Sequence, residues 1–254
     1  MERGSDPLTP ELAASAISWW ADAGVDVLID EEPRDWLRPQ PKAAPAARVA
    51  QAPVARGAPP APPAPESSEP LPGQLSLFQA WLKESDTLPY AAPAAARVCP
   101  SGDPASGLMI LADMPTAEDC TAGTMLAGET GRLFDRMLAA IGRDRDSIYL
   151  AALSCLRSPT GLFTTDGAKN CATLARHHVG LAGPRAVLLL GDACSKALLG
   201  LPLPQARGRW HEIATQAGPV KALVTLTPRQ LLEHPAHKAF AWADLQLLIE
   251  ELNA

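Results

Sequence analysis

The sequence predicts an α/β fold: a three-layer αβα sandwich around a central four-stranded parallel sheet. From residue 107 onward, short continuous apolar runs alternate with amphipathic segments. This alternation is typical of parallel strands that are covered by helices on both faces. The apolar runs are also far shorter than the roughly 20 residues that cross a membrane, so no membrane-spanning segment is expected.

The predicted elements follow one another in a regular order. A short amphipathic helix, with Leu75, Phe78, Trp81 and Leu82 on one side, opens the domain. The predicted strands are 108–112, 147–153, 185–190 and 220–225. The predicted helices are 128–141, 166–181, 192–199 and 236–252. Ligands of such sheets bind beyond the carboxyl ends of the strands, so the residues that follow each strand are the candidates for function.

Two segments of different composition precede this domain, which we assign to residues 74–254. Residues 1–37 carry nine acidic and two basic side chains, and a helix is predicted there from the Thr9 cap to Gly24. Residues 38–73 hold 11 of the 26 prolines, so they bury too little apolar surface to fold and are expected to form a disordered linker. An acidic helix on a flexible linker predicts docking to a basic protein partner, because tethering raises local concentration.

The charges and cysteines argue against several classes of protein and site. Residues 101–254 carry 14 basic and 15 acidic side chains, so the domain lacks the basic footprint typical of many nucleic-acid-binding proteins, although neutrality does not exclude DNA. The five cysteines form no CxxC pair, which argues against both a metal site and a disulfide framework. The N-terminus shows no export signal, and we expect a cytoplasmic protein.

Few polar residues follow the predicted strands. Asp113 comes directly after the first strand, without a glycine-rich phosphate-binding loop. Asp192 follows the third strand, where a helix cap is predicted. Thr227 and Pro228 begin another helix after the fourth strand, with Thr227 as the cap.

Four segments, in this order and spacing, resemble the type-4-like branch of the uracil-DNA glycosylase superfamily. They are GETGRLFDRMLAAIGRDRDSIYL (128–150), PRAVLLLGDACSKALLG (184–200), ARGRW (206–210) and HKAFAWADLQLL (237–248). The resemblance covers residues 108–252 and implies a uracil-DNA glycosylase-like fold. It also implies a relation to enzymes that flip a nucleotide out of DNA and hydrolyse its glycosidic bond.

The family's reactive positions are largely replaced. At the family's G-E-x-P-G turn, residues 112–116 read A-D-M-P-T, so Asp113 keeps the acid that handles the attacking water. Leu126 stands where the family has the Phe that stacks on the flipped base. Ala152 replaces the uracil-reading Asn, and Thr227 replaces the His that supports the departing uracil anion.

These replacements predict impaired uracil excision. Loss of base stacking costs about 1–3 kcal/mol, and loss of a donor to a developing charge costs about 10²–10³ in rate. One interpretation is therefore a repair-related module that binds DNA or protein. The alternative is a divergent glycosylase that acts on uracil or another damaged base through Asp113 and Thr227, and an unrelated α/β enzyme is a third. The candidate DNA contacts are Arg207, Arg209, Pro228, Arg229 and Gln230. The three arginines among them could equally be solvated or salt-bridged.

The resemblance also raises the question of an iron–sulfur cluster, which many type-4 enzymes hold with four cysteines. Residues 74–107 offer only Cys99 in place of the CxxC pair. Cys171 matches the last ligand, but Leu156 stands at the third, one residue after Cys155. We therefore expect no cluster and no other cofactor.

Overall fold

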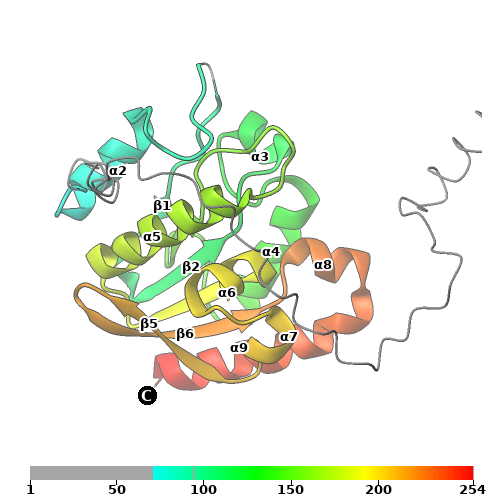
Figure 1. The fold of residues 1–254 in the computed structure, drawn as a ribbon. Coiled ribbons are helices and arrows are strands. Elements are labelled where there is room, and N and C mark those ends of the chain that lie inside the picture. The colour runs from blue at the N-terminus through cyan, green and yellow to red at the C-terminus, as the bar shows by residue number, and fades with distance from the viewer. Residues whose placement is uncertain (1–70, 94, 254) are drawn as a thin grey trace, which may run out of the picture. The chain divides into compact units, whose positions relative to one another are not determined.

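The computed structural model of the chain describes residues 71–93 and 95–253 (Figure 1). The chain divides into two units after Ala64, and all described residues belong to the second. The helix predicted at 9–24, the acidic segment 1–37 and nearly all of the linker 38–73 lie outside the described residues. In the described part of the chain, no helix is long and apolar enough to cross a membrane.

A six-stranded mixed sheet forms the centre of the domain, in the order β1-β3-β2-β4-β6-β5. The strands are β1 Ser101–Gly102, β2 Leu108–Ala112, β3 Tyr149–Ala152, β4 Ala186–Leu190, β5 Trp210–Thr215 and β6 Gly218–Thr225. The inner four, β3, β2, β4 and β6, are parallel, which confirms the predicted four-stranded parallel core. All residues of β2 and β4 are buried, because helices cover both faces of these central strands.

The two edge strands are antiparallel and were not predicted. β5 pairs with β6 through a tight hairpin in which Thr215 lies opposite Gly218. Only Ile213 of β5 is buried, so the strand lacks the continuous apolar run that identified the other strands. β1 has only two residues and pairs with β3.

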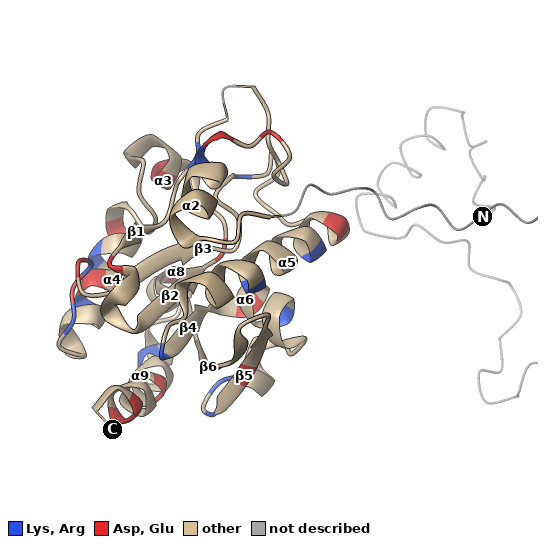
Figure 2. Cartoon of the chain, turned by 90° about the vertical axis from the view of Figure 1, so that its left-hand side faces the viewer, with Lys and Arg blue, Asp and Glu red and all other residues tan. Residues whose placement is uncertain are grey.

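Helices form a layer on each side of the sheet. They are α2 Leu75–Glu84, α3 Ala117–Ala122, α4 Gly128–Ala140, α5 Thr165–Ala182, α6 Gly191–Leu199, α7 Leu203–Ala206, α8 Pro228–Glu233 and α9 Lys238–Asn253, with short 3-10 turns at Pro104–Ser106 and Pro235–His237. Figure 2 shows α5 and α6 on one side of the strands and α4 and α9 on the other. This arrangement confirms the predicted αβα layers.

A capping box explains where α3 begins. Thr116 and Asp119 form the box that opens this helix, which the sequence analysis did not predict. The predicted cap at Asp192 is wrong, because α6 already begins at Gly191 and Leu190 holds the cap position. The Asp192 carboxylate instead accepts a hydrogen bond from the backbone N–H of Leu203 at 2.9 Å and pairs with Lys196 at 2.6 Å.

A second, smaller core attaches α2 to the domain. Phe78 is buried and its ring lies 5.1 Å from the ring of His178. Gln79 donates to the Tyr149 hydroxyl at 2.8 Å, and that hydroxyl is also 2.8 Å from His178 Nε2. Burial lowers the pKa of His178 to about 4, with a smaller effect from His177. The side chain is therefore neutral near pH 7.

Candidate active site

The carboxyl ends of β2, β4 and β6 meet at one edge of the sheet, and a cavity of about 140 Å³ opens there. It brings together five of the predicted site residues: Asp113, Leu126, Thr227, Pro228 and Arg229. Arg157 and Thr130, which the sequence analysis did not single out, also line it. Segments up to 117 residues apart in the chain, from Ala112 to Arg229, thus converge on one cavity.

Asp113 lines this cavity with a carboxyl group that is largely removed from solvent. Its Oδ1 atom is buried and has no hydrogen-bond partner among the described residues. Burial, and to a smaller extent the negative charge of Asp192, raise the pKa of the Asp113 carboxyl to about 6. A buried polar atom without a partner is unfavourable in a folded protein, so Asp113 is suited to bind a water molecule or a ligand group that enters the cavity.

Thr227 uses its hydroxyl group to start α8, as the sequence predicted. Its Oγ1 accepts a hydrogen bond from the backbone N–H of Gln230 and donates to Gln230 Oε1, both at 3.2 Å. The Gln230 side chain in turn accepts from the Thr227 N–H at 3.0 Å. The hydroxyl group and the glutamine side chain therefore satisfy each other and the helix terminus.

The Thr227 methyl group lies beside Gly191, at the start of α6. Gly191 has a φ of +89°. A Cβ at this position would lie 2.6 Å from the Thr227 methyl carbon and 3.9 Å from Asp113 Oδ2. A side chain at position 191 would therefore collide with the Thr227 methyl group, and glycine is required there.

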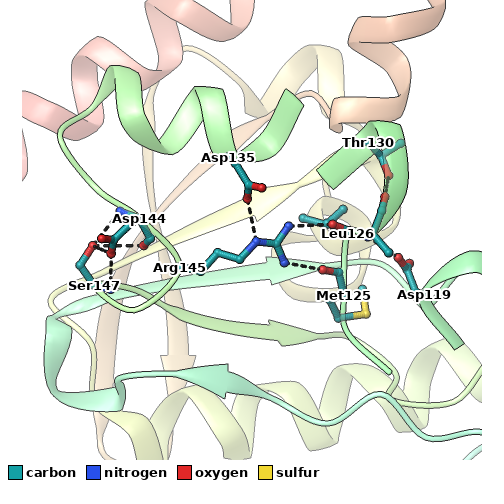
Figure 3. A network of polar contacts seen from close by, with 9 residues as sticks. Asp119, Met125, Leu126, Thr130, Asp135, Asp144, Arg145 and Ser147 are labelled. Atoms are coloured by element: carbon teal, nitrogen blue, oxygen red, sulfur yellow. Dashed lines mark hydrogen bonds and ion pairs between the residues drawn. The ribbon is translucent and has the colours of Figure 1, made fainter. Parts of the chain in front are cut away.

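Leu126 occupies a strained backbone conformation that a polar network holds in place. Its φ is +54°, a region that non-glycine residues rarely adopt. Arg145 donates to the carbonyl oxygens of Met125 at 2.8 Å and Leu126 at 2.7 Å, and its Nε contacts Asp135 at 2.6 Å (Figure 3). Buried Asp119 accepts from the backbone N–H of Ala127 at 2.7 Å.

The sequence analysis missed the residues of this network for different reasons. The spacing of Thr116 and Asp119 is a capping-box signal that could have identified Asp119. Arg145 had no such signal, because two of its partners are backbone carbonyl groups and therefore leave no pattern in the sequence. Close packing adds to the constraint, since a Cβ at Gly131 would collide with the Leu126 carbonyl oxygen.

Ala152 does not line the Asp113 cavity. It pairs with Ala112 in the register of β3 and β2, and it lines a separate cavity of about 20 Å³ beside Phe78 and Cys171. Its methyl group offers no hydrogen bond. The described residues thus provide no amide group at the position where the resemblance places the uracil-reading Asn.

The arginines predicted to contact DNA differ in their surroundings. Arg207 donates to Asp244, which is 0% exposed, at 2.9 Å, and stacks over the Phe240 ring. Arg209 donates to the Gln205 carbonyl at 2.6 Å, and neither arginine lines the cavity. Arg229 and Arg157 do line it, both are exposed, and neither pairs with an acid among the described residues.

The cysteines do not fit an iron–sulfur cluster. Such clusters bind four cysteine thiolates, and Leu156 stands at the position of the third. Cys155 packs in the apolar cluster with Phe78 and Leu82 of α2. In residues 71–93 and 95–253, no group of three or more His, Cys, Asp or Glu side chains is placed to hold a metal ion.

Comparisons with known proteins agree with this architecture. The family profile of the uracil DNA glycosylase superfamily matches residues 99–246, which is more than half of the chain. The chain is also 24% identical over 153 residues to a protein of Pyrobaculum aerophilum named type-4 uracil-DNA glycosylase. That alignment covers 58% of this chain and 78% of the relative. The match of fold, strand-end cavity and family profile confirms the resemblance: the chain belongs to the uracil DNA glycosylase superfamily.

Proposed function

We propose that the protein binds DNA at the Asp113 cavity, in a repair-related role, and is catalytically impaired toward uracil. The observation that carries this proposal is the state of Thr227. Its hydroxyl group is engaged in the α8 cap, and its methyl group lies beside Gly191. The position where the resemblance calls for a leaving-group donor therefore supplies no free donor.

The other two replaced positions support the same proposal. Leu126 gives the cavity an aliphatic surface without an aromatic face. Ala152 lies outside the cavity, and its methyl side chain cannot form a hydrogen bond with a base. A site discriminates strongly for a polar base only when it forms hydrogen bonds with that base. Shape and apolar contact alone do not provide that discrimination.

Binding of DNA is supported by the cations at the cavity. Arg157 and Arg229 are exposed and line it, and arginines at such positions neutralise phosphates. The Arg157 Nη1 donates to the Pro115 carbonyl at 3.2 Å, which orients the guanidinium group beside the Asp113 turn.

Fluorescence anisotropy with the full chain tests this proposal. We expect equal affinity for a single-stranded oligonucleotide with a central uracil and for the same oligonucleotide with thymine. Arg229→Gln should weaken binding of both oligonucleotides by a similar factor. Arg136→Gln, an exposed arginine of α4 that does not line this cavity, is the matched control and should leave both affinities unchanged. Clear preference for uracil would contradict impaired recognition.

One observation favours a second function, a divergent glycosylase. Asp113 keeps a buried, unpartnered oxygen and a pKa near the physiological range, which suits an acid or base that acts on water. Such a group could hydrolyse a base that departs without help from the protein. Incubation with oligonucleotides carrying uracil or hypoxanthine, followed by alkaline strand cleavage, tests this function. Strand cleavage that disappears in Asp113→Asn would establish it.

The acidic segment 1–37 remains the proposed contact for a protein partner. Its nine acidic residues against two basic ones favour a basic partner. A pull-down with the full chain and with a chain lacking residues 1–37 tests this proposal. Equal recovery of partners by the two chains would remove it.

A further inference from the structure

A second, larger hollow lies next to the Asp113 cavity. It has a volume of about 810 Å³ and runs between α5 and α6; we call it the α5/α6 groove. Its apolar lining includes Leu153, Leu162 and Phe163. Segment 157–164 lines both hollows: Arg157 and Gly161 line the Asp113 cavity, and Leu162 and Phe163 line the groove.

We propose that the α5/α6 groove binds single-stranded nucleic acid that continues from a nucleotide held at the Asp113 cavity. This inference rests on the proposed function, because it requires DNA at that cavity. Bases would pack against Leu162 and Phe163, and phosphates would lie near Lys169 and Lys196. Single-strand sites combine a cationic groove with surfaces on which bases stack.

Hydrogen bonds hold the segment that carries the exposed leucine of the groove. Leu153 of the groove lining is buried, whereas Leu162 is 71% exposed. Its carbonyl oxygen accepts from Ser158 Oγ at 2.7 Å. Two residues later, the N–H of Thr164 donates to the Tyr90 hydroxyl at 3.0 Å, and the Tyr90 ring lies 6.2 Å from that of Phe163. These contacts hold the backbone on both sides of Leu162, and its side chain remains accessible to a ligand.

The charges of the groove favour a polyanion. Its lining holds three cations, Lys169, Arg176 and Lys196, and one acid, Asp192. Lys196 pairs with Asp192 at 2.6 Å, and Lys169 lies 3.6 Å from Asp166. Both lysines are largely exposed, and such surface pairs are weak, so phosphates can compete for them.

Arg176 differs from the two lysines, because its guanidinium group already binds backbone carbonyl groups of α6. Its Nη2 donates to the carbonyl oxygens of Ala197 at 2.8 Å and Leu198 at 3.1 Å. These bonds connect α5 to the end of α6 and fix the spacing of the groove walls. The phosphate contacts are therefore assigned to the two lysines, and Arg176 contributes its charge and this connection.

A matched pair of double variants in the full chain tests the groove. Lys169→Gln/Lys196→Gln removes two cations from it, and Arg136→Gln/Lys238→Gln removes two from the separate hollow between α4 and α9. We expect the first variant to bind a 15-nucleotide single strand about tenfold more weakly at 0.1 M salt, with a salt slope smaller by about 1.4. The control should change neither value.

Leu162→Ser tests the apolar surface separately from charge. Single-strand affinity should fall about fivefold, because an apolar contact between the Leu162 side chain and a base is lost, and the salt slope should stay the same. Binding of a blunt 15-base-pair duplex should respond less to Leu162→Ser, because its bases are paired and stacked inside the helix.

The outcomes separate this inference from the proposed function. Failure of the wild-type chain to bind any DNA would overturn both. If wild-type binding weakens in Arg229→Gln but not in Lys169→Gln/Lys196→Gln, the proposed function stands and the groove inference is wrong. Lys169→Gln/Lys196→Gln could instead leave single-strand affinity unchanged and weaken binding of an acidic peptide, such as residues 23–37. This result would overturn the inference in favour of a protein ligand.

Discussion

Replacement of Asp113 by Asn should stabilise the protein, and increasingly so as the pH rises. The carboxyl group loses hydration in the cavity wall, and the pKa of Asp113 is raised from 3.8 to about 6. The folded state therefore holds this proton more tightly than the unfolded state does. The destabilising effect is absent well below pH 3.8, develops as the pH rises through about 6, and is complete above that value.

The size of the effect follows from the two pKa values. One pKa unit corresponds to about 1.4 kcal/mol, so burial of the charged Asp113 destabilises the wild type by about 3 kcal/mol at pH 8. At pH 4.5, where most of the folded molecules are protonated, the same relation gives about 1 kcal/mol. The stability gained in Asp113→Asn should therefore grow by about 2 kcal/mol between these pH values.

Urea unfolding at pH 4.5 and pH 8, followed by circular dichroism, measures this gain. Asp146→Asn removes a charge from an exposed position and is the matched control. Its difference from the wild type should be nearly the same at both pH values. Parallel pH dependences for wild type and Asp113→Asn would refute the electrostatic account of the cavity, whatever the absolute stabilities.

Three further predictions concern groups around the site and the second core. Asp192→Asn should lower the pKa of Asp113, since the charge of Asp192 helps to raise it; a carboxyl carbon NMR titration measures this shift, and an unchanged midpoint would contradict it. Arg145→Gln removes two charged hydrogen bonds to the segment around Leu126. It should therefore destabilise the fold by about 2 kcal/mol and increase hydrogen exchange in that segment. Unaltered exchange there would show that the segment holds its own conformation. The lowered pKa of His178 predicts that the free energy of unfolding falls by about 3 kcal/mol as the pH falls from 6.5 to 4. His178→Gln should make the free energy of unfolding, measured with urea, depend less on pH in this range. An equally steep pH dependence would assign the loss to other groups.

Much of the fold could be predicted because its signals are local. The run 108–112 was predicted as a strand with the bounds that β2 has, since five consecutive buried apolar residues leave a continuous pattern. The edge strand β5 escaped prediction because it buries one residue and pairs through backbone groups. Short α3 depends on a capping box, a weaker signal than amphipathic periodicity.

The site was only partly predictable because its contacts join distant segments. The resemblance placed Asp113, Leu126 and Thr227, and the structure gathers them at one cavity. The ion pair between Arg207 and Asp244 spans 37 residues and depends on the packing of α9, so a residue-by-residue comparison could not reveal it. Arg157 likewise reaches the cavity through a loop whose path no local pattern determines.

The most direct test of the account is the rate of uracil release from a fully formed complex. Full-length protein is mixed in excess with a labelled single strand that carries one uracil, and saturation is verified by anisotropy in the same solution. Abasic sites are then followed over time by alkaline cleavage, with Asp113→Ala as the background. The account predicts bound DNA and no uracil release above that background; Asp113-dependent release from the saturated complex would contradict it.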